Sequence, residues 1–381
     1  MAPKKRSRLS IPPASPAGGG ANDGVLPTDV LHDILLRLPA KQLCRLRVVC
    51  RAWRALTSDP CFARAHTPRH PLFAGLILAS ERKELQVLDL SGDVVKRLRI
   101  TDERDEGDML LRGIPPGVCI AWCCRKACVL NPATGDVTVL DTNRLSKVNG
   151  VFTKFVVGRI PATGEHKVLH IYQDTRNRSN DERQKCNVTT LDSRDHKWRS
   201  RPGPPTRIVW DSPPVIGGVA YFFVNSCFTE DNGTQGIASF DLETEDWRPV
   251  ILRRSIGSLS AIFDGKGFYW NSLHFAELNG SLVIVHLNSK NSSMDLWFLE
   301  DMDKNLWTKR YSMRRSTACG WSRYNSYPPL DILDGRIILW ERSEQALRAF
   351  HPKTSTWTEL AVLKDYSDVG MLEGSLLCSG L

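Results

Sequence analysis

Cysteine and histidine groupings are the first places in this sequence where a metal ion could bind. His166 and His170 could share one face of a strand, but no third ligand lies near them in the sequence. A cluster of cysteines lacks the paired C-x2-C spacing of a structural zinc site. Its members are Cys119, Cys123, Cys124 and Cys128. We interpret the cysteines as packing residues of a strand pair and the histidines as part of a surface hairpin. We predict no metal site.

No other pattern predicts catalysis. Gly265-Lys266-Gly267 lies between apolar runs and is not followed by a helix, so it is typical of a turn and not of a phosphate-binding loop. The charged run 102–108 is typical of a solvated loop. No residue set predicts a general acid, a general base or a nucleophile. We therefore predict a non-catalytic protein without a cofactor.

The bulk properties bound the class of protein. The chain has 381 residues, of which 41% are hydrophobic, which is enough for two or three domains with a sizeable core. It contains no run of eighteen apolar residues, and the basic N-terminus has no apolar stretch behind it. We expect no membrane span and no secretory signal, hence a reducing compartment in which the 11 cysteines stay free.

The positive charge is concentrated near the N-terminus. Of the net +9, residues 1–24 contribute +3 (four basic, one acidic) and residues 25–70 contribute +5 (eight basic, three acidic), which leaves +1 for the rest. A nucleic-acid-binding domain would carry its basic patch where it binds. Nucleic acid is therefore not expected to be the main partner.

Residues 1–23 are rich in Pro, Gly, Ser and charge and lack apolar periodicity, which predicts a disordered tail. Its basic cluster has two interpretations, a nuclear import signal or a solvated basic tail. The expected location is the cytoplasm, the nucleus or both. The cluster consists of Lys4, Lys5, Arg6 and Arg8.

Residues 24–70 predict a small all-α domain of three helices. Apolar residues first recur at positions 0, 1, 4, 5 and 8 from Val30, the stripe of one helical face. Thr28 is the expected N-cap, and Pro39 is expected to end this helix. A second stripe runs from Leu43 to Cys50, and a third helix would carry Trp53 and Leu56, before a turn at 58–60.

Residues 71–381 predict an all-β domain, because short apolar runs alternate with Gly, Asp, Asn and Pro. A polar turn residue followed six positions later by Trp recurs in four copies. Two earlier copies, from Asp89 and Asn131, have Val in place of Trp. The six starts are 42, 61, 49, 60 and 50 residues apart. The copies with Trp run from Asp192 to Trp198, Asp241 to Trp247, Asp301 to Trp307 and His351 to Trp357.

Each residue type of the repeat has a structural reason. Asp can accept hydrogen bonds from the backbone two residues on, and the Trp that follows can pack between neighbouring sheets. A second repeated element is a Gly that opens an apolar strand, as expected after a tight turn. A period near fifty residues predicts a β-propeller of six blades, with seven as the alternative, in which strands near Leu76 and Val87 complete the last blade. The repeated glycines are Gly218, Gly280, Gly335 and Gly374.

The sequence of the helical segment, LPTDVLHDILLRLPAKQLCRLRVVCRAWRALTSDPCFARAH, resembles the F-box in order and spacing. The resemblance implies docking on the Skp-family adaptor of a cullin–RING ubiquitin ligase. Helix-in-groove recognition uses apolar anchors at helical spacing. Not all apolar residues can serve both the core and a partner. The residues expected to bind the adaptor are Leu26, Pro27, Leu31, Ile34, Leu35, Leu38, Val49, Cys50 and Trp53.

The β domain is similar to the kelch-like and F-box-associated propellers of plant F-box proteins, although the kelch diglycine occurs only once, at Gly217-Gly218. Together the two resemblances imply the substrate receptor of an SCF-type ligase, which binds an unknown target protein. The alternatives are an F-box protein that assembles no ligase, and a ligand-binding or enzymatic propeller. Aromatic residues in Pro-flanked stretches are the candidate target contacts. They are Trp210, Trp321, Tyr324 and Tyr327.

Overall fold

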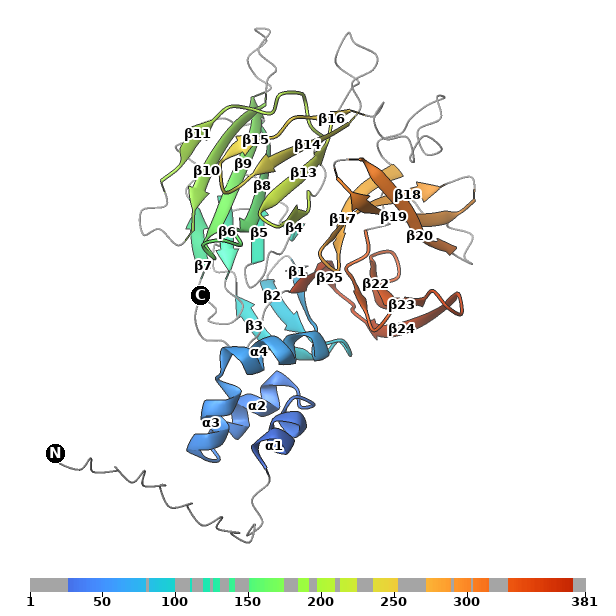
Figure 1. Ribbon diagram of the computed structural model, residues 1–381. Coiled ribbons are helices and arrows are strands. Elements are labelled where there is room, and N and C mark those ends of the chain that lie inside the picture. The colour runs from blue at the N-terminus through green and yellow to red at the C-terminus, as the bar shows by residue number, and fades with distance from the viewer. Residues whose placement is uncertain are drawn as a thin grey trace, which may run out of the picture.

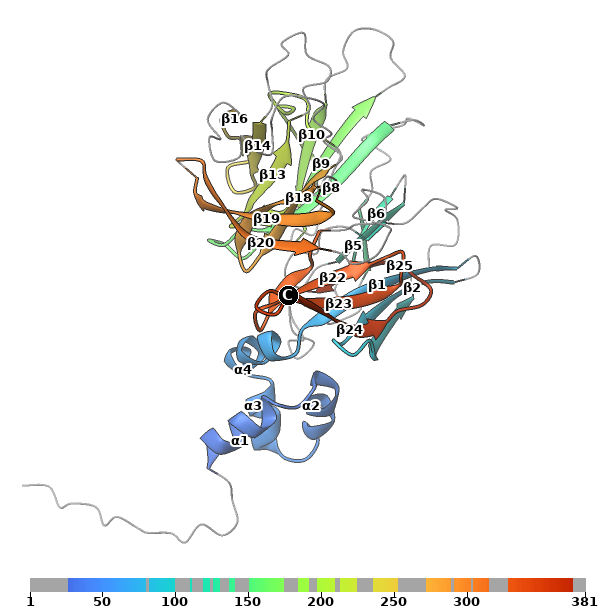
Figure 2. The same ribbon diagram turned by 90° about the vertical axis from the view of Figure 1, so that its right-hand side faces the viewer.

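The computed structural model divides into a helical module and a larger set of β-sheets (Figure 1). In two views at right angles the helices lie together at one end of the molecule, with α4 nearest to the sheets (Figure 2). The structure describes residues 27–79, 82–99, 110–111, 119–123, 126–130, 137–140, 151–174, 184–191, 197–209, 213–224, 236–252, 272–288, 291–302, 304–314 and 328–372. The basic tail 1–23 lies outside these ranges.

The helical module has four short helices, one more than predicted. They are α1 (Thr28–Leu35), α2 (Ala40–Leu46), α3 (Arg51–Thr57) and α4 (Pro60–His66), followed by the 3-10 turn η1 (Thr67–Arg69).

The extra helix replaces the turn that we expected at 58–60. The Asp59 carboxylate accepts a hydrogen bond from the Cys61 backbone N–H at 2.6 Å, and Pro60 occupies the first helical turn, where its missing N–H costs nothing. The predicted ends of α1 are also corrected. Pro27, not Thr28, is the N-cap, and Pro39 is the N-cap of α2, because α1 already ends at Leu35.

The described strands form six antiparallel sheets, numbered here by their order along the chain. Sheet 1 contains β25 (Tyr366–Leu372), β1 (Leu72–Ala79), β2 (Arg82–Leu88) and β3 (Val94–Arg99). Sheet 2 contains β4 (Leu110–Leu111), β5 (Cys119–Cys123), β6 (Lys126–Leu130) and β7 (Val137–Leu140). Sheet 3 contains β8 (Val151–Arg159), β9 (His166–Asp174), β10 (Lys185–Thr190) and β11 (Arg199–Arg201).

The remaining sheets follow the same plan. Sheet 4 contains β12 (Val215–Ile216), β13 (Val219–Phe223), β14 (Gly236–Asp241) and β15 (Asp246–Trp247), with β16 (Ile251–Leu252) paired to β14. Sheet 5 contains β17 (Leu273–Leu278), β18 (Ser281–Asn288), β19 (Ser293–Asp301) and β20 (Leu306–Arg314). Sheet 6 contains β21 (Asp331–Leu333), β22 (Arg336–Glu341), β23 (Ala346–His351) and β24 (Thr356–Val362).

The sheets pack on one another in chain order, and the last packs on the first. Separate apolar clusters join sheets 2 and 3, 3 and 4, 4 and 5, and 5 and 6. Sheet 6 packs on sheet 1 through Trp340 and Phe73, and β4 of sheet 2 contacts β1 and β25 of sheet 1. This cyclic order is that of a β-propeller.

The two ends of the β domain meet in sheet 1. Strand β25 pairs with β1 from Leu72 opposite Leu372 to Ile77 opposite Tyr366, so a C-terminal strand completes a sheet built from N-terminal strands. We predicted that strands near Leu76 and Val87 complete the last sheet in this way. The C-terminal partner that we expected was the apolar run at Gly374, which lies outside the described residues. Closure removes two sheet edges that would otherwise be open to aggregation.

The turn chemistry of the repeat is confirmed in two of its copies. The Asp241 carboxylate accepts hydrogen bonds from the backbone N–H groups of Glu243 at 2.8 Å and Thr244 at 3.3 Å. The Asp89 carboxylate binds the N–H of Ser91 at 3.0 Å in the same way. These bonds fix the hairpins before the outer strands of sheets 4 and 1.

The four tryptophans of the repeat occupy corresponding places, as predicted. Trp247, Trp307 and Trp357 lie opposite Phe240, Leu299 and Phe350 at the start of their outer strands. Each indole packs between its own sheet and the preceding one, and Trp198 does the same just before β11.

Two of the repeated glycines stand in type I′-like hairpins. Gly280 and Gly335 have φ +73, and each follows a residue that is also left-handed, Asn279 at φ 51 and Asp334 at φ 50. Asn-Gly and Asp-Gly are the pairs that such two-residue turns prefer. The predicted fold class, a helical module followed by an all-β propeller, is therefore confirmed.

Candidate partner-binding surfaces

The helical module has a small core of its own. Leu35, Leu43 and Phe62 are each at most 1% exposed, and Leu36, Ala40 and Ala63 complete the buried cluster. Side chains of α1, α2, α3 and the connection between α1 and α2 pack around it. They are Leu31, Leu38, Leu46, Trp53 and Leu56.

A histidine pair fastens the last helix of the module to the first. The His66 ring nitrogen Nε2 lies 2.8 Å from the Leu38 carbonyl oxygen, and His70 Nε2 lies 3.0 Å from that of Leu36. The two rings are stacked with centroids 4.3 Å apart. They satisfy carbonyls beyond the end of α1, which lack partners in the helix. Burial lowers the pKa of His66, which favours the neutral ring.

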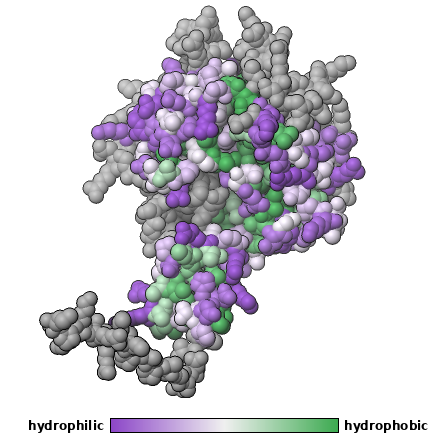
Figure 3. All heavy atoms as spheres, in the orientation of Figure 1, coloured by the Kyte–Doolittle hydropathy of each residue, from purple (hydrophilic) through white to green (hydrophobic). Residues whose placement is uncertain are grey.

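Apolar side chains also remain on the surface of the module. Val48 is 87% exposed and Val49 60%, between α2 and α3, while Val30 and Ile34 on α1 are 41% and 43% exposed. Four of the seven large exposed apolar side chains among the described residues thus belong to this short module. In the space-filling view, hydrophobic residues gather on the visible face of the module with hydrophilic ones at its margins (Figure 3). Such a patch is typical of an interaction site.

The structure separates the predicted adaptor contacts into three groups. Pro27, Ile34, Val49 and Cys50 are exposed. Leu31, Leu38 and Trp53 are partly buried against the core, whereas Leu35 is 1% exposed and fills it. Leu26 lies outside the described residues.

Two further residues join the exposed group. Val30 and Val48 belong to the apolar pattern of the sequence, but we did not predict them as contacts. The sequence could have indicated Val48 as a contact, because this residue directly precedes the predicted contact Val49 in a stretch without acidic residues.

The connections between strands of the propeller differ on its two sides. On the side where the chain enters β1 from the module, hairpins are short, as at 89–93, 217–218, 242–245 and 352–355. The longest connections join strand ends of the other side. They are 100–109, 141–150, 175–184, 202–214, 224–235, 253–272 and 315–330.

All four aromatic residues predicted to contact a target lie in these long connections. Trp210 falls between β11 and β12, and Trp321, Tyr324 and Tyr327 fall between β20 and β21. They lie outside the described residues, so their role stays a prediction. Long connections on a rigid scaffold are common sites of recognition.

The histidines considered as metal ligands are buried between sheets. His166 is 5% and His170 2% exposed on β9, and the His170 ring stacks on Phe155 at 4.4 Å. The predicted surface hairpin is therefore wrong for this pair. Burial lowers the pKa of His170 to about 3, so the ring is neutral at physiological pH.

Most of the other sequence patterns with possible chemistry fall outside the part of the chain that the structure describes. Residues 102–108, 124 and 265–267 lie outside the described ranges. Within those ranges, no group of three His, Cys, Asp or Glu side chains is arranged to hold a metal ion. No described helix is long and apolar enough to cross a membrane.

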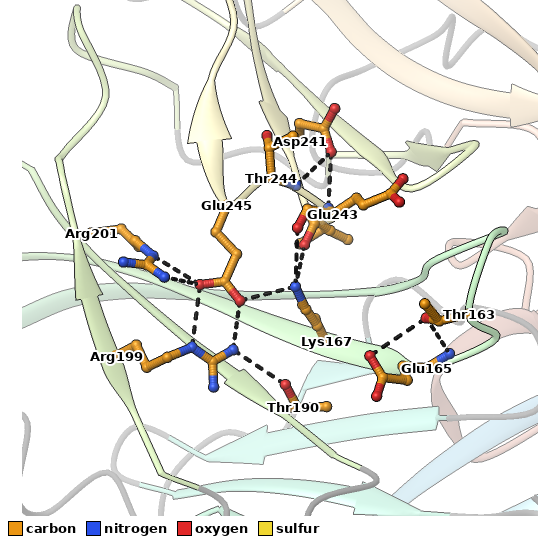
Figure 4. Close-up of polar contacts among 11 residues, drawn as sticks. Thr163, Glu165, Lys167, Thr190, Arg199, Arg201, Asp241, Glu243, Thr244 and Glu245 are labelled. Atoms are coloured by element: carbon orange, nitrogen blue, oxygen red, sulfur yellow. Dashed lines mark hydrogen bonds and ion pairs between the residues drawn. The ribbon is translucent and has the colours of Figure 1, made fainter.

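A buried ionic cluster joins sheets 3 and 4 (Figure 4). Its centre is Glu245, whose side chain is 7% exposed in the hairpin before β15. Lys167 of β9 lies 2.9 Å from the carboxylate, and the guanidinium groups of Arg199 and Arg201 on β11 lie 2.5 and 2.6 Å from it. Lys167 also donates to the Leu242 carbonyl at 2.8 Å.

Neighbouring cations and burial shift the pKa of Glu245 in opposite directions. Burial alone would raise the pKa of this carboxyl, but the hydrogen bonds from Arg199, Lys167 and Arg201 lower it to about 2. Two residues later, the Trp247 indole N–H donates to the Pro202 carbonyl at 3.0 Å. This hairpin therefore ties sheet 4 to sheet 3 by both charge and packing.

The model of the F-box associated beta propeller domain matches residues 115–345, more than half of the chain, and the F-box-like model matches residues 24–67. The chain is a member of the F-box associated β-propeller family. The F-box-like match covers all of the helices α1 to α4. In this F-box protein the four-helix module is thus the F-box.

The chain is similar to F-box proteins of Arabidopsis thaliana. One is 26% identical over 320 residues, 77% of this chain and 77% of the relative. Another is 23% identical over 389 residues, 90% of this chain and 88% of the relative. An F-box/kelch-repeat protein of the same plant is 23% identical over 348 residues, 84% and 87% of the two chains. These plant relatives agree with the resemblance identified from the sequence.

Proposed function

We propose that this protein is the substrate-recognition subunit of an SCF-type ubiquitin ligase. The F-box would bind a Skp-family adaptor and through it a cullin–RING ligase, and the propeller would bind a target protein. The observation that carries the proposal is the set of exposed valines and isoleucine on a module that the F-box-like model matches. Exposed apolar side chains of this size gain free energy when a partner covers them.

The adaptor contacts follow from exposure. Val30, Ile34, Val48, Val49 and Cys50 would contact the adaptor directly, with Pro27 at the start of α1. Leu35 would support this surface from the core, and Leu31, Leu38 and Trp53 would lie at its border. Leu26 is proposed as a contact from its place in the F-box motif alone.

The propeller would act as a rigid receptor of six blades, one for each sheet. The six-sheet order among the described strands supports this number over seven. We assign target binding to the side with the long connections, which include Trp210 and Trp321. The short hairpins of the other side leave less variable backbone for recognition.

The ligase chemistry would belong to other subunits. This protein would contribute by raising the effective concentration of the target near the transferred ubiquitin. We assign the domains to residues 24–70 and 71–381, preceded by the basic tail 1–23. The basic cluster from Lys4 to Arg8 would serve as a nuclear import signal, so that the protein would act in the nucleus as well as in the cytoplasm.

Affinity purification of the full chain from plant cells tests the proposal. We expect a Skp-family adaptor and a cullin among the proteins recovered, together with the target. Recovery of the adaptor without a cullin would favour an F-box protein that assembles no ligase. Recovery of neither would refute the proposal.

A further inference from the structure

The F-box has an unusual run of charge. Between Asp33 and Asp59 it carries six basic residues and no acidic residue. The run includes the end of α1, the whole of α2 and α3, and the exposed valines between them. Its basic residues are Arg37, Lys41, Arg45, Arg47, Arg51 and Arg54.

Five of these six side chains are exposed and have no partner among the described residues. The exception, Arg47, binds Thr57 at the end of α3, with Nη2 2.7 Å from the carbonyl oxygen and Nε 3.3 Å from Oγ1. For the other five, no ion pair or hydrogen bond to a described residue is found.

Three of these five cations flank Val48 and Val49, the two most exposed large apolar side chains in the described part of the chain. Arg45 is in the last turn of α2, and Arg51 and Arg54 lie three residues apart on α3, hence on one side of that helix. Val48 and Val49 stand between them in the chain. This exposed segment therefore combines two aliphatic side chains with three flanking cations.

The propeller treats its charges differently. Arg310 forms a bidentate pair with Glu300, and Arg348 binds Glu341 and Glu344. Unpaired like charges on neighbouring helices repel one another, whereas carboxylates supplied by a partner would relieve this repulsion. The five cations of the F-box without a described partner therefore add no ion pair to its fold, and they are available to pair with carboxylates of a binding partner.

We propose that the adaptor surface that receives Val48 and Val49 is acidic, and that Arg45, Arg51 and Arg54 steer its association. This inference rests on the proposed function and names the chemistry of its docking site. A protein surface fits better than a nucleic acid, because the centre of the patch is aliphatic and phosphate backbones offer no apolar groove for valine.

The test compares association rates of the full chain with a recombinant Skp-family adaptor at 50 and 500 mM NaCl. The variant is R51E/R54E. Its matched control is K353E/K364E, which makes the same charge change at two exposed positions of the propeller. The conservative variant R51K/R54K keeps the charge.

The expected loss is about tenfold in the association rate constant of R51E/R54E at 50 mM NaCl, shrinking to about twofold at 500 mM. The loss shrinks because the screening length falls to roughly 4 Å. K353E/K364E and R51K/R54K should both behave like the parent.

Two results would overturn the inference. One is an association rate that depends on neither salt nor these arginines while the adaptor still binds, which would leave the proposed function intact. The other is that the parent binds duplex DNA or anionic vesicles and R51E/R54E does not, while both proteins associate with the adaptor at the same rate. Failure of the adaptor to bind at any salt concentration would instead refute the proposed function itself.

Discussion

The F-box and the propeller use the same residue types in opposite ways. In the propeller, tryptophans and aliphatic side chains turn inward between sheets, and a buried carboxylate such as Glu245 is surrounded by cations. In the F-box, Val48 is 87% exposed and Arg51 and Arg54 have no described partner. A region that satisfies its own groups can stand alone, whereas one that leaves them unsatisfied is built for a partner.

The largest effect should come from placing charge in the exposed apolar patch. The V48D/V49D variant should lose about 4 kcal/mol of adaptor binding, roughly a thousandfold in Kd, because each lost anchor costs about 2 kcal/mol. Titration calorimetry with the adaptor measures this. V362D changes a valine of β24 that is 52% exposed, and it should leave Kd unchanged. Equal losses in both variants would end the contrast between the two regions.

Next in size is the loss of the central carboxylate in the ionic cluster. E245Q should destabilise the propeller by about 3 kcal/mol, because three cations are left around a neutral group in a buried site. Urea unfolding measures it. E300Q disrupts the exposed pair with Arg310 and should cost less than about 1 kcal/mol. Similar costs for both variants would show that burial of the cluster has no energetic consequence.

The same cluster predicts a pH dependence. The folded-state pKa of Glu245, about 2, is below its ordinary value, so its contribution to stability is complete above about pH 4.5 and is lost as pH falls towards 2. The free energy of unfolding of the parent should therefore fall more steeply over this range than that of E245Q. Parallel curves for the two proteins would contradict the assignment.

A smaller effect is expected where a tryptophan reaches the preceding sheet. W247F removes the N–H that donates to Pro202 at 3.0 Å and part of the ring that packs between sheets 3 and 4. The expected cost is about 1–2 kcal/mol of propeller stability. Thermal unfolding measures it. W357F, which loses the bond to the Arg314 carbonyl, should cost a similar amount if the positions are equivalent.

The smallest effect should be local to the F-box. D59A removes the cap of α4 and should cost about 1 kcal/mol of F-box stability, seen as faster amide exchange in α4. D59N keeps a capping oxygen and should exchange nearly like the parent. Faster exchange in the propeller of D59A would show that the two regions do not have separate cores.

The propeller was predictable because its signals are local and repeated. Asp241 binds the turn that follows it, and Trp247 lies at a fixed distance along the hairpin, so spacing alone fixes their roles. The cluster around Glu245 was not predictable, because Lys167 is 78 residues away along the chain. The sequence around either residue gives no indication that the two side chains meet. Sequence-distant charges meet only once the sheets are packed.

The F-box was predictable in outline and not in detail. The apolar stripe marks α1, but periodicity cannot tell the buried Leu35 from the exposed Ile34 directly before it. Helix α4 was missed because Asp59-Pro60 is a strong signal for both a turn and a helix start. The bonds of His66 and His70 to carbonyls after α1 depend on the packed core and leave no local signature.

Reconstitution of the complex tests the central claim most directly. The full chain, a Skp-family adaptor and the N-terminal half of a cullin would be mixed and separated by size-exclusion chromatography with light scattering. We predict one 1:1:1 species for the parent and for V362D, and free chain for V48D/V49D. A folded parent chain that elutes apart from the adaptor would contradict it.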